Sequence, residues 1–185
     1  MDRYRSLRPA ELSDAQRRVY DSIVSGPRGL VEGPLEVWLH SPRLAERAQA
    51  LGAYCRYHSY LPPRLSELAI VTVGAYWQAG FEWTVHAPLA AKAGIGDAVL
   101  EAIRTGAEPA FTQVDEAAVF RFTKELLRDH RVSPQTFADA ERLLGTEGVV
   151  DLTGILGYYT LISMTILAFE VPLPEGAPEP FVNAG

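Results

Sequence analysis

The feature that most limits the fold is the repeated pairing of helix-start and helix-stop signals along the chain. Ser13 followed by Gln16 has the pattern of a capping box, and Gly26-Pro27 ends the helix that this box predicts. Ser41-Pro42 and Ser133-Pro134 each place a capping serine before a proline at the first helical position. No segment keeps the alternation of apolar and polar residues that is typical of a strand. These signals predict an all-α protein, a compact bundle of several helices.

The expected helices cover most of the chain. After the first one, they are predicted at residues 42–60, 64–79, 82–93, 97–105, 115–129, 134–144 and 149–169, with a short helical turn at 34–39. Residues 149–169 are apolar nearly all round, which predicts a helix enclosed by protein on every side, including a partner subunit. This segment contains Asp151, so we expect a buried helix and no contact with a membrane. Four prolines between residues 172 and 180 predict an extended tail over residues 171–185.

Composition limits the domain count and the partners. A chain of 185 residues with 48% apolar side chains suits one domain, which we expect to span residues 1–185. The net charge of −6 disfavours binding to nucleic acid, because the field of the protein repels phosphates. Cys55 is the one cysteine, so neither an intrachain disulfide nor a CxxC pair can form. Residues 1–14 are charged and lack the apolar stretch of a secretory signal, which predicts a cytoplasmic protein.

Residues 67–95 concentrate ionisable side chains in an otherwise apolar segment. Glu67 is expected in the first turn of its helix, where the helix dipole favours a negative charge. Glu82 and His86 are four residues apart, so they lie on one face of the next helix. A histidine beside a carboxylate can transfer protons near pH 7. The alternative is a solvated carboxylate and an ordinary surface pair.

Aromatic side chains surround these ionisable groups in the sequence. Aromatic walls lower the local dielectric and shift pKa values, which favours a catalytic pocket. The predicted substrate-binding residues are Tyr76, Trp77, Trp83, His58 and Tyr158. Each of them could instead be an ordinary core or solvent-facing residue. Arg56 or Arg64 could hold an anionic group of a substrate.

Motifs for nucleotides, serine hydrolases and zinc proteases are missing. The chain has no GxGxxG, P-loop, GxSxG or HExxH pattern. His86, Glu82, Glu67 and His58 could supply metal ligands, but no two histidines share a helical face. We therefore expect a site without a metal or another cofactor.

The segment 63–103 resembles the carboxymuconolactone decarboxylase family, which also contains the alkylhydroperoxidase D-like proteins. In the peroxidase branch, a glutamate opens one helix, and a CxxC followed after three residues by a histidine lies on the next. Glu67 and His86 match the glutamate and the histidine, whereas Ala79 and Glu82 occupy the two cysteine positions. The chain therefore looks like the thiol-free branch, without the peroxidase chemistry. The resemblance implies the alkylhydroperoxidase D-like fold and a homo-oligomer (a dimer, a trimer or a multiple), with the site near a subunit interface.

The expected function is that of a cofactor-free lyase. It would decarboxylate a small carboxylated lactone or a related enolisable acid by proton transfer. His86 would donate the proton, Glu67 would orient the imidazole, and Glu82 would act as a second acid-base group or would destabilise the substrate carboxylate. Trp77 and Trp83 would exclude water. An isomerase, hydratase or cyclase could use the same dyad, and a non-catalytic oligomer that binds a small ligand or a partner is the alternative from another class.

Overall fold

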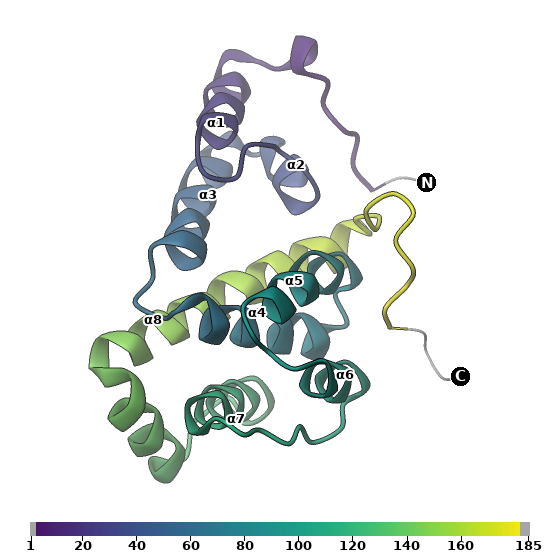
Figure 1. Cartoon of the computed structure of the whole chain (residues 1–185). Coiled ribbons are helices and arrows are strands. Elements are labelled where there is room, and N and C mark those ends of the chain that lie inside the picture. The colour runs from purple at the N-terminus through teal and green to yellow at the C-terminus, as the bar shows by residue number, and fades with distance from the viewer. Residues whose placement is uncertain (1–2, 182–185) are drawn as a thin grey trace.

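The structure is a computed structural model that describes residues 3–181, and its regular elements are helices (Figure 1). In chain order they are η1 (Pro9–Glu11), α1 (Asp14–Ser25), α2 (Pro34–Leu39), α3 (Pro42–Tyr57), α4 (Pro63–Trp77), α5 (Gly80–Lys92), α6 (Asp97–Thr105), α7 (Val114–Asp129) and α8 (Pro134–Phe169). No strand occurs within residues 3–181. The expected all-α class is confirmed.

Helix α4 forms the centre of the fold. All ten residues from Leu65 to Gly74 are buried, and the helix contacts α5, α7 and α8. The β-branched run from Ile70 to Val73 has a high strand propensity, but it is helical here because its length and apolar character suit a fully enclosed helix. This central helix carries Glu67 into the interior of the protein.

Helix α8 consists of two helical parts that meet at a kink. The sequence predicts helices at 134–144 and 149–169, and the span Pro134–Phe169 is indeed interrupted at Gly145, whose backbone is not helical. Gly145 has φ 71° and ψ 169°, a conformation that glycine adopts without steric cost. The chain therefore changes direction at residue 145, and the second half of α8 crosses the molecule beside α4 (Figure 1).

Helix α8 is only partly enclosed by the rest of this chain. Among the described residues, α8 is the one helix that is long and apolar enough to cross a membrane, with a mean hydropathy of 1.6 over its most apolar window. Half of that window is buried against the rest of the chain, including α3, α4 and α7. Val150 and Met164 remain 64% and 50% exposed, and Leu161 is also exposed. The homo-oligomer that would cover this face stays a prediction.

A two-residue turn connects α4 to α5. Gln78 has a left-handed φ of 51°, which ends α4 at Trp77, and Ala79 is followed directly by the first residue of α5, Gly80. The sequence predicts a longer first helix, to residue 79, and a later start of the second at residue 82. The short turn leaves α4 and α5 antiparallel and in contact, so Glu67 and His86 face each other across the pair.

The C-terminal segment lies against α5 and α6. Residues 171–181 form no helix or strand. The ring of Phe181 is 5.6 Å from that of Trp83, and Arg104 Nη1 donates a hydrogen bond to the carbonyl of Pro180 at 2.7 Å. The last part of the expected tail, residues 182–185, lies outside the described residues.

Candidate active site

His86 is held between two carboxylates inside the protein. Its Nδ1 atom lies 2.7 Å from Glu67 Oε2, and its Nε2 atom lies 3.0 Å from Glu82 Oε1. The three residues are 3%, 8% and 4% exposed. The spacing of four residues on α5 positions Glu82 beside the ring, as the sequence predicts.

Glu67 differs from its expected position on the helix. Because α4 begins at Pro63, Glu67 is the fifth helical residue and lies beyond the first turn. The helix dipole acts mainly within that turn. The hydrogen bond to His86 Nδ1 is therefore its main stabilising contact.

The two carboxylates set the protonation of His86. Burial alone lowers the pKa of this imidazole, but the negative charge of Glu82 and the hydrogen bond to Glu67 outweigh burial and raise the pKa to about 9. The ring is therefore an imidazolium near pH 7. The contact between Glu82 Oε1 and His86 Nε2 lacks the alignment of a hydrogen bond, so this oxygen has no hydrogen-bond donor among the described residues.

A cavity of about 290 Å³ opens beside Glu82 and His86. It is lined by residues of α2, α3, α5 and α8 and of the loop between α1 and α2. Its polar lining includes Arg28, Arg56, Glu82, His86, Tyr158 and Tyr159. Glu67 is not part of this lining, so it contacts His86 from behind, while Glu82 and the imidazole face the cavity.

The predicted substrate-binding residues divide into two groups. Tyr158 lines the cavity. Tyr76, Trp77, Trp83 and His58 do not line it. The structure therefore brings together one of these five residues with Glu82 and His86.

The other four residues lie away from this cavity. Trp83 follows Glu82 directly, so its side chain is rotated about 100° around α5 and contacts Phe181 instead. Tyr76 lines a separate surface cavity formed with α6 and α7, and the edge of its ring faces that of Trp77. His58 is the exposed residue that caps α3.

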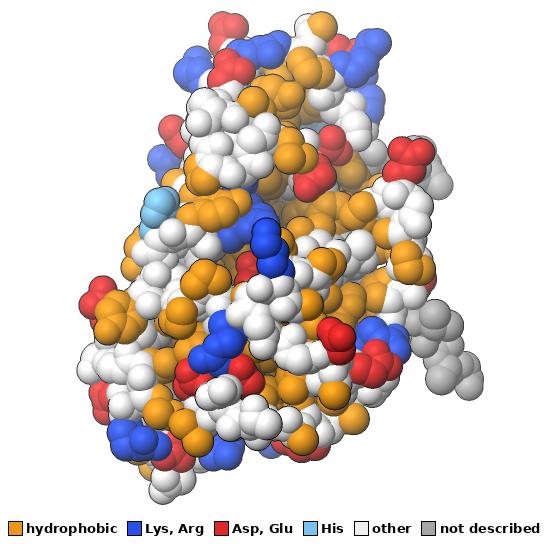
Figure 2. All heavy atoms as spheres, in the orientation of Figure 1, with side chains coloured by type: hydrophobic (Ala, Val, Ile, Leu, Met, Phe, Trp, Pro, Cys, Tyr) orange, Lys and Arg blue, Asp and Glu red, His pale blue; other side chains and the backbone are white. Residues whose placement is uncertain are grey.

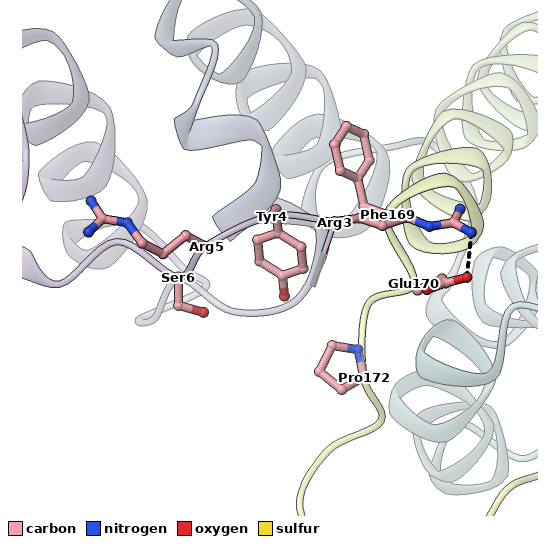
Figure 3. Close-up of a pocket in the computed structure, with 7 residues that line it drawn as sticks. All are labelled: Arg3, Tyr4, Arg5, Ser6, Phe169, Glu170 and Pro172. Carbon is pink, nitrogen blue, oxygen red and sulfur yellow. Dashed lines mark ion pairs between the residues drawn. The ribbon is translucent and has the colours of Figure 1, made fainter. Parts of the chain in front are cut away.

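A larger hollow than the cavity beside His86 lies elsewhere. It has a volume of about 940 Å³ and is lined by the N-terminal segment and by the residues at the end of α8 (Figure 3). Arg3 forms an ion pair with Glu170 at 2.5 Å there, and the lining contains no histidine. The smaller cavity beside His86 is therefore the better candidate for a catalytic site.

Metal and thiol chemistry gain no support from the arrangement of side chains. Within the described part of the chain, no group of three or more His, Cys, Asp and Glu side chains is placed to hold a metal ion. Cys55 is buried, and burial raises the pKa of its thiol to about 11, so the thiol stays protonated near neutral pH. What the site offers is a buried acid-base group next to a cavity.

Several solved structures share this fold, and two of them match it over almost the whole chain. One is described as an alkylhydroperoxidase AhpD core, an uncharacterized peroxidase-related protein from Ralstonia eutropha JMP134; it has a TM-score of 0.76 at 16% identity, over 94% of this chain and 93% of that one. The other is the debrominase Bmp8 without ligand, with a TM-score of 0.70 at 13% identity, over 95% of this chain and 92% of that one. A search of curated protein sequences gave no match. The chain thus has the all-α fold of the alkylhydroperoxidase D-like type.

The sequence of the central helices is similar to that of a known family. The model of the carboxymuconolactone decarboxylase family matches residues 42–125, a range that contains Glu67, Glu82 and His86. This match supports the resemblance that residues 63–103 show to the same family. The chain has Ala79 and Glu82 where the peroxidase branch has cysteines.

Arg28, Phe81 and Tyr159 line the cavity but are not among the five predicted substrate-binding residues. Arg28 comes from a loop almost sixty residues before His86, and no local motif marks it. Phe81 precedes Glu82 directly and lines the same cavity. Tyr159 adjoins the predicted Tyr158, and its ring meets that of His86 edge-on at 5.2 Å. A tyrosine pair in a highly apolar helix is a signal for buried hydroxyl groups, but it does not tell which of the two touches the histidine.

Proposed function

We propose that this protein is a cofactor-free lyase that decarboxylates a small carboxylated lactone or a related enolisable acid. The observation that supports this proposal is the contact of Glu67 and Glu82 with the two ring nitrogens of His86 at the edge of a 290 Å³ cavity. A buried imidazolium is an acid that can deliver a proton to carbon. Such a delivery completes a decarboxylation.

The reaction balances with one proton. The bond between the carboxylate carbon and the neighbouring carbon breaks, CO₂ leaves, and the electron pair moves into a conjugated carbonyl to form an enolate. The enolate carbon then takes the proton of His86 Nε2. A proton from solvent restores the imidazolium, so that substrate and one proton yield product and CO₂.

The two glutamates have different parts in this proposal. Glu67 accepts the hydrogen bond of Nδ1 from behind the ring, which fixes its orientation and leaves Nε2 as the atom that donates. Glu82 lies beside Nε2 in the cavity, where its negative charge holds the imidazolium and repels a substrate carboxylate. Repulsion of the carboxylate that is to be lost favours its conversion into neutral CO₂.

Tyr159 is suited to stabilise the enolate. Its hydroxyl is buried and has no hydrogen-bond partner among the described residues. Burial raises the pKa of Tyr159 well above that of an exposed tyrosine, so the group stays a neutral donor. A donor that is already in place stabilises an oxyanion without further reorganisation.

The proposal is tested by isotope incorporation. The purified protein is incubated in D₂O with a panel of carboxylated lactones and vinylogous keto acids, and CO₂ and product mass are measured. We expect CO₂ together with one deuterium on the carbon that carried the carboxylate. Deuterium uptake without CO₂ would identify an isomerase, gain or loss of water would identify a hydratase, and an unreacted panel would favour the non-catalytic alternative.

Variants connect the reaction to the site. His86→Gln is expected to reduce turnover ~10²- to 10⁴-fold, because general acid catalysis typically contributes that factor. Removing the imidazolium leaves Glu67 and Glu82 buried without a counter-charge, so folding is checked by circular dichroism. Glu82→Gln keeps the pair of His86 and Glu67 and is the second variant, and His130→Gln, at the exposed end of α7, is the control. A folded His86→Gln protein that releases CO₂ at the original rate would overturn the proposal.

A further inference from the structure

Two arginines line the cavity beside His86, and neither forms an ion pair with a carboxylate of the described chain. They are Arg28, in the loop between α1 and α2, and Arg56, in the last turn of α3. Arg64, the other arginine that the sequence offers for an anionic group, is already paired with Asp115 at 2.6 Å and Glu116 at 2.5 Å. The free positive charges of the site are therefore those of Arg28 and Arg56.

Arg28 occupies a space shaped for it. Its Nη2 donates a hydrogen bond to Tyr158 Oη at 3.3 Å, and its buried Nε has no acceptor among the described residues. A Cβ atom at Gly52 would lie 2.6 Å from Nη2 of Arg28 and 2.1 Å from Tyr158 Oη. Glycine at position 52 thus lets the guanidinium and the phenol approach the backbone of α3.

Arg56 lies near the aromatic ring of Tyr57, which also lines the cavity. Its guanidinium carbon is 5.3 Å from the centre of the Tyr57 ring, a distance at which the cation and the ring attract each other. Its positive charge also acts on Tyr159, where it opposes the rise in pKa that burial causes. Arg56 is therefore close to the tyrosine that contacts His86.

The charges around the cavity favour an anionic ligand. Arg28, Arg56 and protonated His86 contribute three positive charges, and Glu32 and Glu82 contribute two negative charges. Figure 2 shows Lys and Arg side chains gathered at a hollow between the N-terminal helices and the helices below them. A guanidinium binds a carboxylate through two parallel hydrogen bonds, which makes arginine the preferred residue for this group.

We propose that Arg28 and Arg56 form an anion-binding subsite that anchors a carboxylate of the substrate next to Glu82 and His86. The role of this subsite in turnover rests on the lyase activity proposed above, whereas the binding of a carboxylate to the two arginines does not depend on that activity. Ion pairs with two guanidinium groups stabilise a carboxylate, so the anchored group is not the one that leaves as CO₂. The substrate is therefore an acid whose product still carries an anionic carboxylate. Arg28 belongs to this subsite although it precedes residues 42–125, the segment that the family model matches.

The subsite is tested by calorimetry on the full chain. The probe is 5-oxotetrahydrofuran-2-carboxylate, a lactone whose carboxylate is not activated for loss, and its methyl ester is the uncharged counterpart. We expect the carboxylate to bind at least ~10-fold more tightly than the ester, and its affinity to fall ~10- to 100-fold in Arg28→Gln and in Arg56→Gln, since a hydrogen bond to a charged group typically contributes that much. Arg47→Gln, on the exposed part of α3, is the matched control and should bind the probe like the original protein.

A third variant moves Arg28 without removing its charge. Gly52→Ala displaces Arg28 and Tyr158 from α3 and should also weaken binding of the carboxylate. Equal affinity for the acid and the ester, an unchanged affinity in both arginine variants, or no binding of the acid would each overturn the subsite.

The two proposals fail in different ways. Arginine-dependent binding in a protein that never releases CO₂ would leave the subsite standing and reject the lyase. Release of CO₂ with binding that does not depend on the arginines would reject the subsite and keep the lyase.

Discussion

Glu67 Oε2 lies 2.7 Å from His86 Nδ1, and this hydrogen bond joins α4 to α5 through two buried ionisable side chains. A carboxylate in this position determines which ring nitrogen faces the cavity and favours the charged form of the imidazole. The proposed chemistry of the site depends on both effects.

Replacing Glu67 by glutamine should change the pH dependence of catalysis. The amide keeps the size of the side chain but loses its charge, so the pKa of His86 is expected to fall from about 9. The alkaline limb of the kcat profile should then move to lower pH, with little change in KM. If Glu67 acted only on folding, activity would drop equally at every pH and the limb would stay in place.

Removing the hydroxyl of Tyr159 should separate stability from activity. An unpartnered buried hydroxyl costs about 1–3 kcal/mol, so Tyr159→Phe is expected to unfold at the same or a higher temperature. Turnover should fall roughly 10-fold or more, because the donor to the enolate is lost. Ser163→Ala removes another unpartnered buried hydroxyl of α8, away from the cavity lining, and should keep full activity. Undiminished turnover in Tyr159→Phe would exclude its part in the reaction.

Stability should decrease at alkaline pH. The folded-state pKa of His86, about 9, lies above the value of 6.5 for an unperturbed histidine, so the protonated ring stabilises the fold fully below about pH 6.5. This contribution is lost as the pH rises through about 9, which should lower the free energy of unfolding by on the order of 1–3 kcal/mol. Denaturant unfolding between pH 7 and pH 10 measures the slope. The double variant Glu67→Gln/Glu82→Gln should give a flatter curve, and parallel curves would contradict the coupling.

The exposed apolar residues of α8, which include Val150, Leu161 and Met164, should mediate self-association. Leu161→Glu introduces a charge among the exposed apolar residues of this helix, whereas Val114→Glu makes the same kind of change at an exposed position of α7. Light scattering after gel filtration is expected to show a smaller particle for Leu161→Glu and an unchanged oligomer for Val114→Glu. A monomeric original protein would show that this face has no second copy as its partner.

Much of the fold could be predicted from local signals. The capping box at Ser13 and the Gly26-Pro27 stop correctly define α1, because caps and breakers act within one or two turns. The interruption at Gly145 agrees with the two helices expected at 134–144 and 149–169, but the start of the second helix directly after Gly145 could not be predicted, because a glycine can either end a helix or kink it.

The site was predictable only as far as helical spacing reaches. A separation of four residues is sufficient to place Glu82 beside His86. It does not give the rotation of α5 relative to the cavity, so Trp83 was expected in the lining but packs against Phe181. Arg28 reaches the cavity through a loop, and its position depends on the space left by Gly52, a relation between distant segments that no pattern in the sequence reveals.

The most direct test of the account is a titration of the imidazole of His86 by NMR. The signal is assigned by comparison with His86→Gln, and the chemical shifts are followed from pH 5 to pH 10.5. Contact with Glu67 and Glu82 predicts that the ring remains protonated at pH 7 and titrates near 9. Titration of His86 near 6.5 in the folded protein, like that of an isolated histidine, would show that the two carboxylates do not hold an imidazolium and would contradict the proposed acid.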